Sequence, residues 1–247
     1  MDKKMRRLFS VVLSFAMLIT TAVTNITPVQ SVQAATQTQE TAVKASNSYG
    51  LANNCQDGTI LHCFNWTYMD IIAELPAIAQ AGFTSIQTSP AQTGCSTGTW
   101  YWLYQPLGFY CTQNDLGTRE ELKQLCEKAD DYGIKVIVDV VANHLAGNHS
   151  NIQDDLKAYN YWHTRGGVPD DKWTDRQWVI KGDIGMQDLA TENDYVEQVV
   201  YKYIQDLKSL GVDGIRFDAA KHIGLPSEGD NFWKVVTADR SCSVCTP

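Results

Sequence analysis

Short apolar runs alternate with amphipathic stretches between residues 58 and 219. The runs have the length of β-strands and are bounded by Gly or Pro, which predicts strands over residues 58–66, 83–89, 134–141 and 212–219. Between them, apolar residues recur every three or four positions, which predicts helices over residues 67–81, 119–132 and 192–210. Pro76 lies inside the first helix and argues against an unbroken helix there.

The middle of the chain carries the clearest signals. Residues 134–141 read IKVIVDVV, a nearly continuous apolar run that is typical of a strand covered on both faces. Before it, Thr118 can cap the helix over residues 119–132, and Glu120 and Glu121 in its first turn suit the helix dipole. Gly133 is expected to end this helix.

The order of strands and helices predicts a parallel α/β sheet with right-handed crossovers. Residues 145–185 are polar and irregular and interrupt this order after the third strand, so we expect an inserted domain there. An open doubly wound sheet and a (β/α)8 TIM barrel both fit the pattern. No G-x-G-x-x-G motif follows the first strand, which weakens a dinucleotide-binding fold.

The amino-terminal segment has the features of a secretory signal peptide. Four basic residues within the first seven precede an apolar run over residues 8–23, and Val32-Gln33-Ala34 supplies small residues at a cleavage site. A membrane-spanning helix is the weaker alternative because it needs about 20 apolar residues. We therefore expect a secreted, extracellular protein that is free of the membrane after signal cleavage, with a flexible tether over residues 35–49.

Composition narrows the classes of protein. The chain has 247 residues, is 44% hydrophobic and 19% charged, and carries a net charge of −8, so it is a globular protein without the basic stripe of a nucleic-acid binder. Its 7 Trp, 11 Tyr and 7 Phe suit stacking on ring-shaped ligands or an aromatic core. Seven cysteines are an odd number for an exported chain; Cys95 and Cys111 could pair, but the connectivity stays open.

Carboxylates stand at the ends of two predicted strands. Asp139 and Asp218 are expected at the edge of a parallel sheet where ligands bind. Arg216 precedes Asp218 by two residues, so both side chains should share one face, and the guanidinium would keep the carboxylate ionised, as a glycosidase nucleophile requires. The alternative is a buried pair that only shapes the loop.

Other residues suggest ligand or metal binding. Asn143 and Asp188 offer oxygen ligands that suit Ca²⁺ better than Zn²⁺, although both are also common turn residues. His144 could donate a hydrogen bond to a ligand or could be a loop histidine with an internal partner. The aromatic residues between 100 and 105 could form a platform for sugar rings or could anchor the loop.

Together these segments resemble the alpha-amylase family, glycoside hydrolase family 13. The stretch DVVANH from Asp139 to His144 resembles the family signature at the third barrel strand, and GIRFDAAKH from Gly214 to His222 resembles the signature at the fourth. The stretch MQDL from Met186 to Leu189 occupies the place of a short motif late in the inserted domain. The resemblance covers roughly residues 58–237, and the sequence of these segments is most similar to that of secreted bacterial members of the family.

The resemblance implies a role for each matching residue. Asp218 would be the nucleophile of a retaining mechanism, Arg216 would hold it, and Asp139 would support the site. The residues implied to contact sugar are Tyr101, Gln105, His144, Lys221 and His222. A structural Ca²⁺ would be bound by Asn143, Asp188 and the backbone carbonyl of His222, with a carbonyl near Val179 or Ile180.

The resemblance also has a limit. The family places its general acid after the fifth strand and a third carboxylate after the seventh, and neither has a counterpart here. Glu228 is a poor substitute because it lies in a loop after the fourth strand. We therefore expect an amino-terminal fragment of an alpha-amylase, containing about the first four strands of a partial (β/α)8 barrel and having little activity alone.

We divide the chain on this basis. The expected parts are a signal peptide (1–34), a tether (35–49), the first part of the barrel (50–144), the inserted domain (145–185), the fourth βα unit (186–237) and an atypical tail (238–247). The expected substrate is starch or a maltooligosaccharide, and the expected state is a monomer. Two alternatives stay open: another alpha-glucan hydrolase or transglycosylase of the same family, and a non-catalytic glucan-binding remnant.

Overall fold

The computed structural model describes residues 49–51, 57–147 and 151–238, and the backbone of residues 243–245. The expected signal peptide and nearly all of the expected tether lie outside the described residues. Within the described part of the chain, no helix combines the length and apolar character needed to cross a bilayer.

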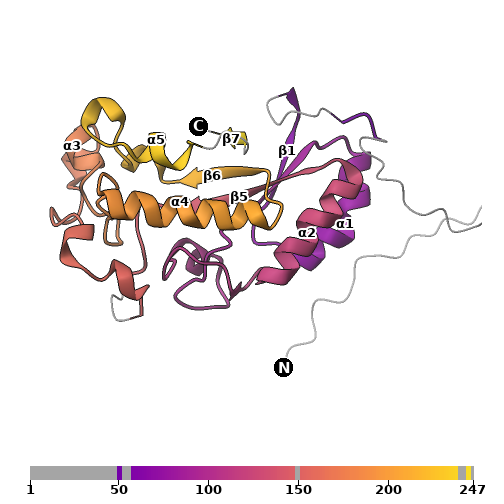
Figure 1. Ribbon diagram of the computed structural model, residues 1–247, viewed down its shortest axis with the longest axis horizontal. Helices are drawn as coiled ribbons and strands as arrows, with labels where there is room; N and C mark the ends of the chain where they lie inside the picture. Colours follow the sequence, from indigo (N-terminus) through magenta and orange to yellow (C-terminus); the bar gives the residue numbers. More distant parts are fainter. Residues whose placement is uncertain (1–48, 52–56, 148–150, 239–242, 246–247) are drawn as a thin grey trace, which may run out of the picture. The chain divides into compact units, whose positions relative to one another are not determined.

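A parallel sheet organises the described residues (Figure 1). Its spatial order is β1-β2-β5-β6-β7. The strands are β1 (Ile60–Cys63), β2 (Ser85–Thr88), β5 (Lys135–Val141), β6 (Gly214–Asp218) and β7 (Ser243–Cys245). Every neighbouring pair in this sheet is parallel, as the alternating sequence pattern predicts.

One long helix follows each of the first three strands. These helices are α1 (Tyr68–Gln80), α2 (Arg119–Tyr132) and α4 (Asp194–Ser209). The first two pack side by side (Figure 1), and α4 packs against the short helix α5, Phe232–Val236. This repeated strand–helix order is that of a partial (β/α)8 barrel.

The predicted boundaries hold within a few residues. Thr118 and Glu121 form a reciprocal capping box at the start of α2, and Gly133 ends the helix with a φ of 72°. Strand β5 is buried over nearly its whole length, as expected of a strand covered on both faces. The helix α1 continues through Pro76, which lies on the exposed side of the helix.

The segment between β5 and α4 is irregular, as predicted. Short 3₁₀ turns and one short helix, α3 (Arg176–Val179), alternate with isolated bridges such as His144 to Asp188 and Trp162 to Leu189. Trp162 is buried and its indole N–H donates to the carbonyl of Leu156 at 2.9 Å, and both residues belong to the same hydrophobic core as the sheet and its helices.

Two features differ from the sequence expectations. The tail expected to be atypical contributes β7, which pairs parallel with β6, so the sheet has five strands where we expected about four. Cys95 and Cys111 are both free thiols and do not pair, and Cys63 and Cys126 are also free. A small antiparallel hairpin, β3 (Gln113–Asn114) with β4 (Gly117–Thr118), lies in the long loop before α2.

Glycines with positive φ connect helices to the following strands, and two of them form a matched pair. Gly82 (φ 86°) has open space where a Cβ would stand, whereas a Cβ on Gly211 (φ 99°) would lie 2.9 Å from the Cβ of Cys126. An added side chain would therefore strain the backbone at both Gly82 and Gly211, but it would clash with a neighbouring residue at Gly211 alone of the two.

We predict that Gly82→Ala lowers the free energy of unfolding by about 1 kcal/mol and that Gly211→Ala lowers it by a further ~1–3 kcal/mol. Urea denaturation of both variants measures the difference. Adding Cys126→Ala to Gly211→Ala should not recover the extra loss, because the clashing atom is the Cβ of residue 126, which alanine keeps, whereas the sulfur of Cys126 lies 3.9 Å away. Equal losses in the two glycine variants would show that the clash does not exist.

Candidate active site

A cleft of about 590 Å³ opens at the carboxyl ends of the parallel strands. The described residues that line it are His62, Gln87, Trp100, Tyr104, His144, Ile184, Met186, Arg216 and Asp218. They come from β1, β2 and β6, from the loop before β3, and from the insertion. Ligands bind at this edge in parallel α/β folds.

Arg216 joins two carboxylates at the floor of this cleft. Its Nη1 donates to Oδ1 of Asp218 at 2.8 Å and to both carboxylate oxygens of Asp139 at 2.9 Å. Arg216 and Asp218 are two residues apart on β6, and Asp139 lies opposite Arg216 in the register of β5. The expected shared face of Arg216 and Asp218 is therefore confirmed.

The two carboxylates differ in their access to solvent. Asp139 is fully buried, whereas the side chain of Asp218 keeps 24% of its surface exposed and lines the cleft. Burial raises the pKa of Asp139 to about 6, and the charge and hydrogen bonds of Arg216 oppose that rise. Asp139 therefore holds Arg216 from below while Asp218 faces any ligand above.

Aromatic side chains form one wall of the cleft. Trp100, 49% exposed, packs near Phe64 with ring centroids 5.5 Å apart, and Tyr104 packs near both. The hydroxyl of Tyr104 donates to Oδ2 of Asp139 at 3.1 Å. Tyr104 therefore anchors the loop, and Trp100 presents a ring to the cleft; the role of this stretch as a platform for sugar rings stays a prediction.

His144 also lines the cleft and is almost completely buried. Its Nε2 donates to the backbone carbonyl of Tyr104 at 3.1 Å, and its Nδ1 has no hydrogen-bond partner among the residues that the structure describes. Burial lowers the pKa of His144, so the neutral ring is favoured at pH 7. A neutral ring that donates through Nε2 leaves Nδ1 as an acceptor.

Four residues expected to contact sugar do not line this cleft. The ring of Tyr101 packs against that of Trp102, with centroids 4.6 Å apart. The cleft is instead lined by two other residues of this loop, Trp100 and Tyr104. Gln105 accepts a hydrogen bond from the thiol of Cys95 at 3.7 Å.

The other two follow β6. The ammonium of Lys221 lies 5.5 Å from the ring centroid of Trp173, and the buried ring of His222 donates from Nδ1 to the carbonyl of Val179 at 2.6 Å. Sugar contacts by Tyr101, Gln105, Lys221 and His222 stay predictions.

Conversely, the sequence analysis did not assign a role to several lining residues. His62 and Gln87 lie on neighbouring strands, paired in register, and point to the cleft from β1 and β2. Burial lowers the pKa of His62, and the nearby charge of Arg216 adds to this. His62 stands second to last in its strand, and its position at a strand end is the sequence signal that points to it.

Asn143 and Asp188, expected to bind a metal, lie next to each other. The N–H of Leu189 donates to the carbonyl of Asn143 at 2.8 Å, and both side chains are fully buried. Within the described part of the chain, the amide oxygen and nitrogen of Asn143 and Oδ1 of Asp188 have no hydrogen-bond partner of normal geometry, although Asn143 is near enough to help lower the pKa of Asp188 against the effect of burial. Buried polar atoms of this kind are normally satisfied, so these oxygens are candidates to accept a ligand.

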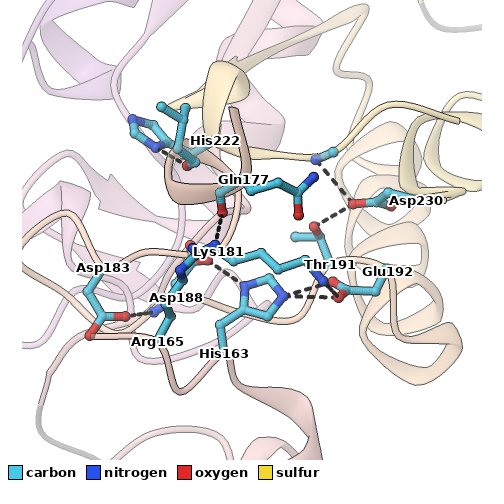
Figure 2. A network of polar contacts seen from close by, with 12 residues as sticks. His163, Arg165, Gln177, Lys181, Asp183, Asp188, Thr191, Glu192, His222 and Asp230 are labelled. Atoms are coloured by element: carbon cyan, nitrogen blue, oxygen red, sulfur yellow. Dashed lines mark hydrogen bonds and ion pairs between the residues drawn. The ribbon is translucent and has the colours of Figure 1, made fainter. Parts of the chain in front are cut away.

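A histidine that the sequence analysis missed holds the other oxygen of Asp188. His163 donates from Nδ1 to Oδ2 of Asp188 at 2.6 Å and from Nε2 to Glu192 at 2.9 Å, and Lys181 also binds Glu192 at 2.9 Å (Figure 2). Burial lowers the pKa of His163, but the two carboxylates outweigh it and raise the pKa to about 9. This network fixes the orientation of Asp188.

The described residues contain no group of three or more His, Cys, Asp or Glu placed to hold a metal. A metal at Asn143 and Asp188 would therefore need carbonyl oxygens as further ligands, which suits Ca²⁺ and excludes a typical zinc site. The carbonyl of Val179 already accepts a hydrogen bond from His222.

Glu228 is committed to a structural ion pair. Its carboxylate accepts from Nε and Nη2 of Arg176 at 2.7 and 2.9 Å. These bonds lower the pKa of Glu228, so its carboxyl group stays ionised. Glu228 is also not among the residues that line the cleft. A general acid needs a raised pKa, which agrees with the expectation that Glu228 is a poor substitute.

A parallel strand–helix unit with charged side chains gathered where its strands end places the chain among the α/β proteins, a class that includes (β/α)8 barrels and open doubly wound sheets. Comparison with known proteins identifies the family. Residues 66–241 match the family model described as alpha amylase, catalytic domain. The chain belongs to the alpha-amylase family.

Relatives and solved structures agree with this family. An alpha-amylase from Clostridium acetobutylicum is 36% identical over 209 residues, which cover 78% of this chain and 27% of the relative. An alpha-amylase from Butyrivibrio fibrisolvens is 36% identical over 203 residues, which cover 76% of this chain and 21% of the relative. The chain thus spans about a quarter of the length of these curated relatives.

The structural neighbours include an alpha-amylase from Geobacillus thermoleovorans in complex with acarbose, at a TM-score of 0.66 and 25% identity, covering 77% of this chain and 46% of that one. A complex of alpha-amylase I from Eisenia fetida with maltohexaose has a TM-score of 0.66 at 22% identity, covering 76% and 44%. The expected partial TIM barrel is confirmed.

The raised pKa of Asp139 predicts a pH effect on stability. The folded protein binds the carboxyl proton of Asp139 more tightly than the unfolded chain does. The contribution of this proton to the free energy of unfolding is therefore fully present below pH 3.8 and is lost as the pH rises through about 6. Between pH 4 and pH 7 the free energy of unfolding should therefore fall by up to ~3 kcal/mol at this residue.

Urea denaturation of wild type and Asp139→Asn across this range measures the effect. The variant should lack this slope, and Asp154→Asn, an exposed carboxylate in the insertion, should keep it. Parallel profiles for wild type and Asp139→Asn would show that the pKa of Asp139 is not raised.

Proposed function

We propose that this chain contributes the nucleophile and part of the substrate cleft of a retaining alpha-amylase that cleaves internal α-1,4-glucosidic bonds of starch. The single observation that carries the proposal is the carboxylate of Asp218, hydrogen-bonded to Arg216 and lining the cleft beside Trp100. The alpha-amylase relatives and the neighbour solved with maltohexaose support the substrate class.

In this mechanism Asp218 attacks the anomeric carbon of the bound sugar and forms a glycosyl ester. The glycosidic oxygen leaves with a proton from a general acid, and water then hydrolyses the ester. Arg216 keeps Asp218 ionised and directs its free oxygen, while the buried Asp139 keeps Arg216 in place. Trp100 offers a ring face to a sugar in the cleft.

Retaining glycosidases place two carboxyl groups about 5–5.5 Å apart. Among the described residues that line the cleft, Asp218 is the single carboxylate. These residues therefore supply the nucleophile but not the acid. A substrate whose leaving group needs no protonation separates the two roles.

We predict that the 247-residue chain reacts with a 5-fluoro-α-glucosyl fluoride, because fluoride departs without an acid, and that it hydrolyses starch only weakly. Intact-protein mass spectrometry should detect one covalent sugar, and peptide mapping should place it on Asp218. Asp218→Asn should give no adduct. An adduct at another carboxylate, or none with folded wild type, would refute the assignment of the nucleophile.

We further propose that Asn143 and Asp188 bind a structural Ca²⁺ together with backbone carbonyls, including that of His222. The support is the pair of buried oxygens without a partner, one on each side chain, which are the ligand type that Ca²⁺ prefers. Asn143 follows β5 and Asp188 ends the insertion, so the ion would tie the insertion to the barrel.

We predict that saturating Ca²⁺ stabilises the chain by about 3 kcal/mol at a concentration 100 times the Kd, and that EDTA reverses this. Thermal denaturation with and without Ca²⁺ measures the effect. Asp188→Ala should abolish the shift, whereas Asp154→Ala, an exposed carboxylate in the same insertion, should not change it. The same Ca²⁺ response in Asp188→Ala would exclude this site.

We also propose that the protein acts outside the cell. The support is the basic and apolar pattern of the first 34 residues, and starch is a polymer too large to enter a cell intact. Expression in a secreting host, followed by amino-terminal sequencing of the protein in the medium, tests this proposal. Cleavage near Ala34 is the expected result, and retention in the cell would contradict it.

A further inference from the structure

One arginine of the insertion holds the chain segment that follows β6. Arg176 is the first residue of α3, and its guanidinium donates to the backbone carbonyls of Lys221 and Ile223, the second at 2.8 Å. Its Nε and Nη2 donate to the two carboxylate oxygens of Glu228 at 2.7 and 2.9 Å. Four hydrogen bonds from one side chain thus fix residues 221–229, the post-β6 loop, which begins shortly after Asp218.

The last residue of α3 provides a second tie to this loop. Nδ1 of the buried His222 donates to the carbonyl of Val179 at 2.6 Å (Figure 2). Glu228 also accepts from the backbone N–H of Leu225 at 2.8 Å, which closes the loop on itself. Both ends of this short helix therefore hold the post-β6 loop, and the position of the loop depends on the insertion.

These bonds set the direction of the carbonyl that lies between them. Ile223 is extended, with φ −96° and ψ 137°, and successive carbonyls of an extended chain point to opposite sides. Since the carbonyl of Ile223 faces Arg176, the carbonyl of His222 is directed away from it. The carbonyl of His222 is the backbone ligand proposed above for the structural Ca²⁺.

Charge and geometry predict opposite effects of this arginine on Ca²⁺ binding. A positive charge near a cation site repels Ca²⁺, so its removal would strengthen binding if charge alone mattered. The planar fork of a guanidinium holds carboxylate and carbonyl oxygens in a geometry that the ammonium of lysine does not reproduce. Loss of the fork would weaken binding, because the released loop would have to be ordered when the ion binds.

We propose that Arg176 is a positioning residue for the Ca²⁺ site, because it fixes the post-β6 loop with the carbonyl of His222 directed away from α3 and available to the ion. This proposal rests on the Ca²⁺ site of the proposed function. It adds a residue that acts on the ion through the loop, and it makes the segment that follows the nucleophile dependent on the insertion.

Isothermal titration of the EDTA-treated 247-residue chain with Ca²⁺ tests this role. Arg176→Ala should raise the Kd about tenfold, and Arg176→Lys, which keeps the charge but not the fork, should raise it about threefold to tenfold. Arg165→Ala is the matched control, since this side chain supports α3 itself through the carbonyl of Gln177 at 2.8 Å and the ring of Trp178 (Figure 2). The control should change the Kd by less than about twofold.

A second readout needs no metal. Hydrogen–deuterium exchange of the chain in EDTA should be faster across the post-β6 loop in Arg176→Ala and Arg176→Lys than in wild type, and unchanged there in Arg165→Ala. Thermal melting shows whether each variant is folded. Arg176→Lys keeps the test decisive if Arg176→Ala does not fold.

The outcomes separate this proposal from the metal site on which it rests. Wild type that binds Ca²⁺ while the folded Arg176 variants bind it equally well or more tightly overturns the positioning role alone, as does unchanged exchange of the post-β6 loop. Wild type that binds no Ca²⁺ overturns the metal site and this proposal with it. The adduct experiment at Asp218 tests the nucleophile independently of both.

Discussion

The site depends on one guanidinium that serves two carboxylates in different surroundings. Asp139 is fully buried, and a buried carboxylate without a cation is strongly destabilising, so Arg216 is required where it stands. The parallel register of β5 and β6 places Asp139 opposite Arg216, and the two-residue period of β6 then puts Asp218 on the same face. The position of the exposed carboxylate therefore follows from a requirement of the buried one.

Much of the fold could be predicted because local signals and tertiary contacts agree. The apolar run of β5 and the capping residues of α2 each specify one structure, and both predictions were confirmed. Pro76 was misleading because proline usually interrupts a helix, whereas α1 continues through this position on its exposed side. Strand β7 was missed because its pairing with β6 joins segments about 30 residues apart, and its own sequence is short and lacks an apolar run.

The candidate site was predicted less completely than the fold. Spacing alone was sufficient for Arg216 and Asp218, which share one strand. Trp100 and Tyr101 are neighbours in a 3₁₀ turn, and which of them lines the cleft depends on how the whole loop packs. His163 shows the same limit, since its role depends on partners on other elements.

Ala219, directly after Asp218, has a φ of 52°, a left-handed conformation that an L-residue other than glycine rarely adopts. The chain turns sharply there from β6 into the 3₁₀ turn over Ala220–His222. A methyl group in this position narrows the backbone angles that are open to the turn, at a cost of about 1–2 kcal/mol. The protein thus gives up some stability for a restricted turn beside Asp218. If this carboxylate is the nucleophile proposed above, the restricted turn limits how far the strand end can shift when a sugar ester forms on it.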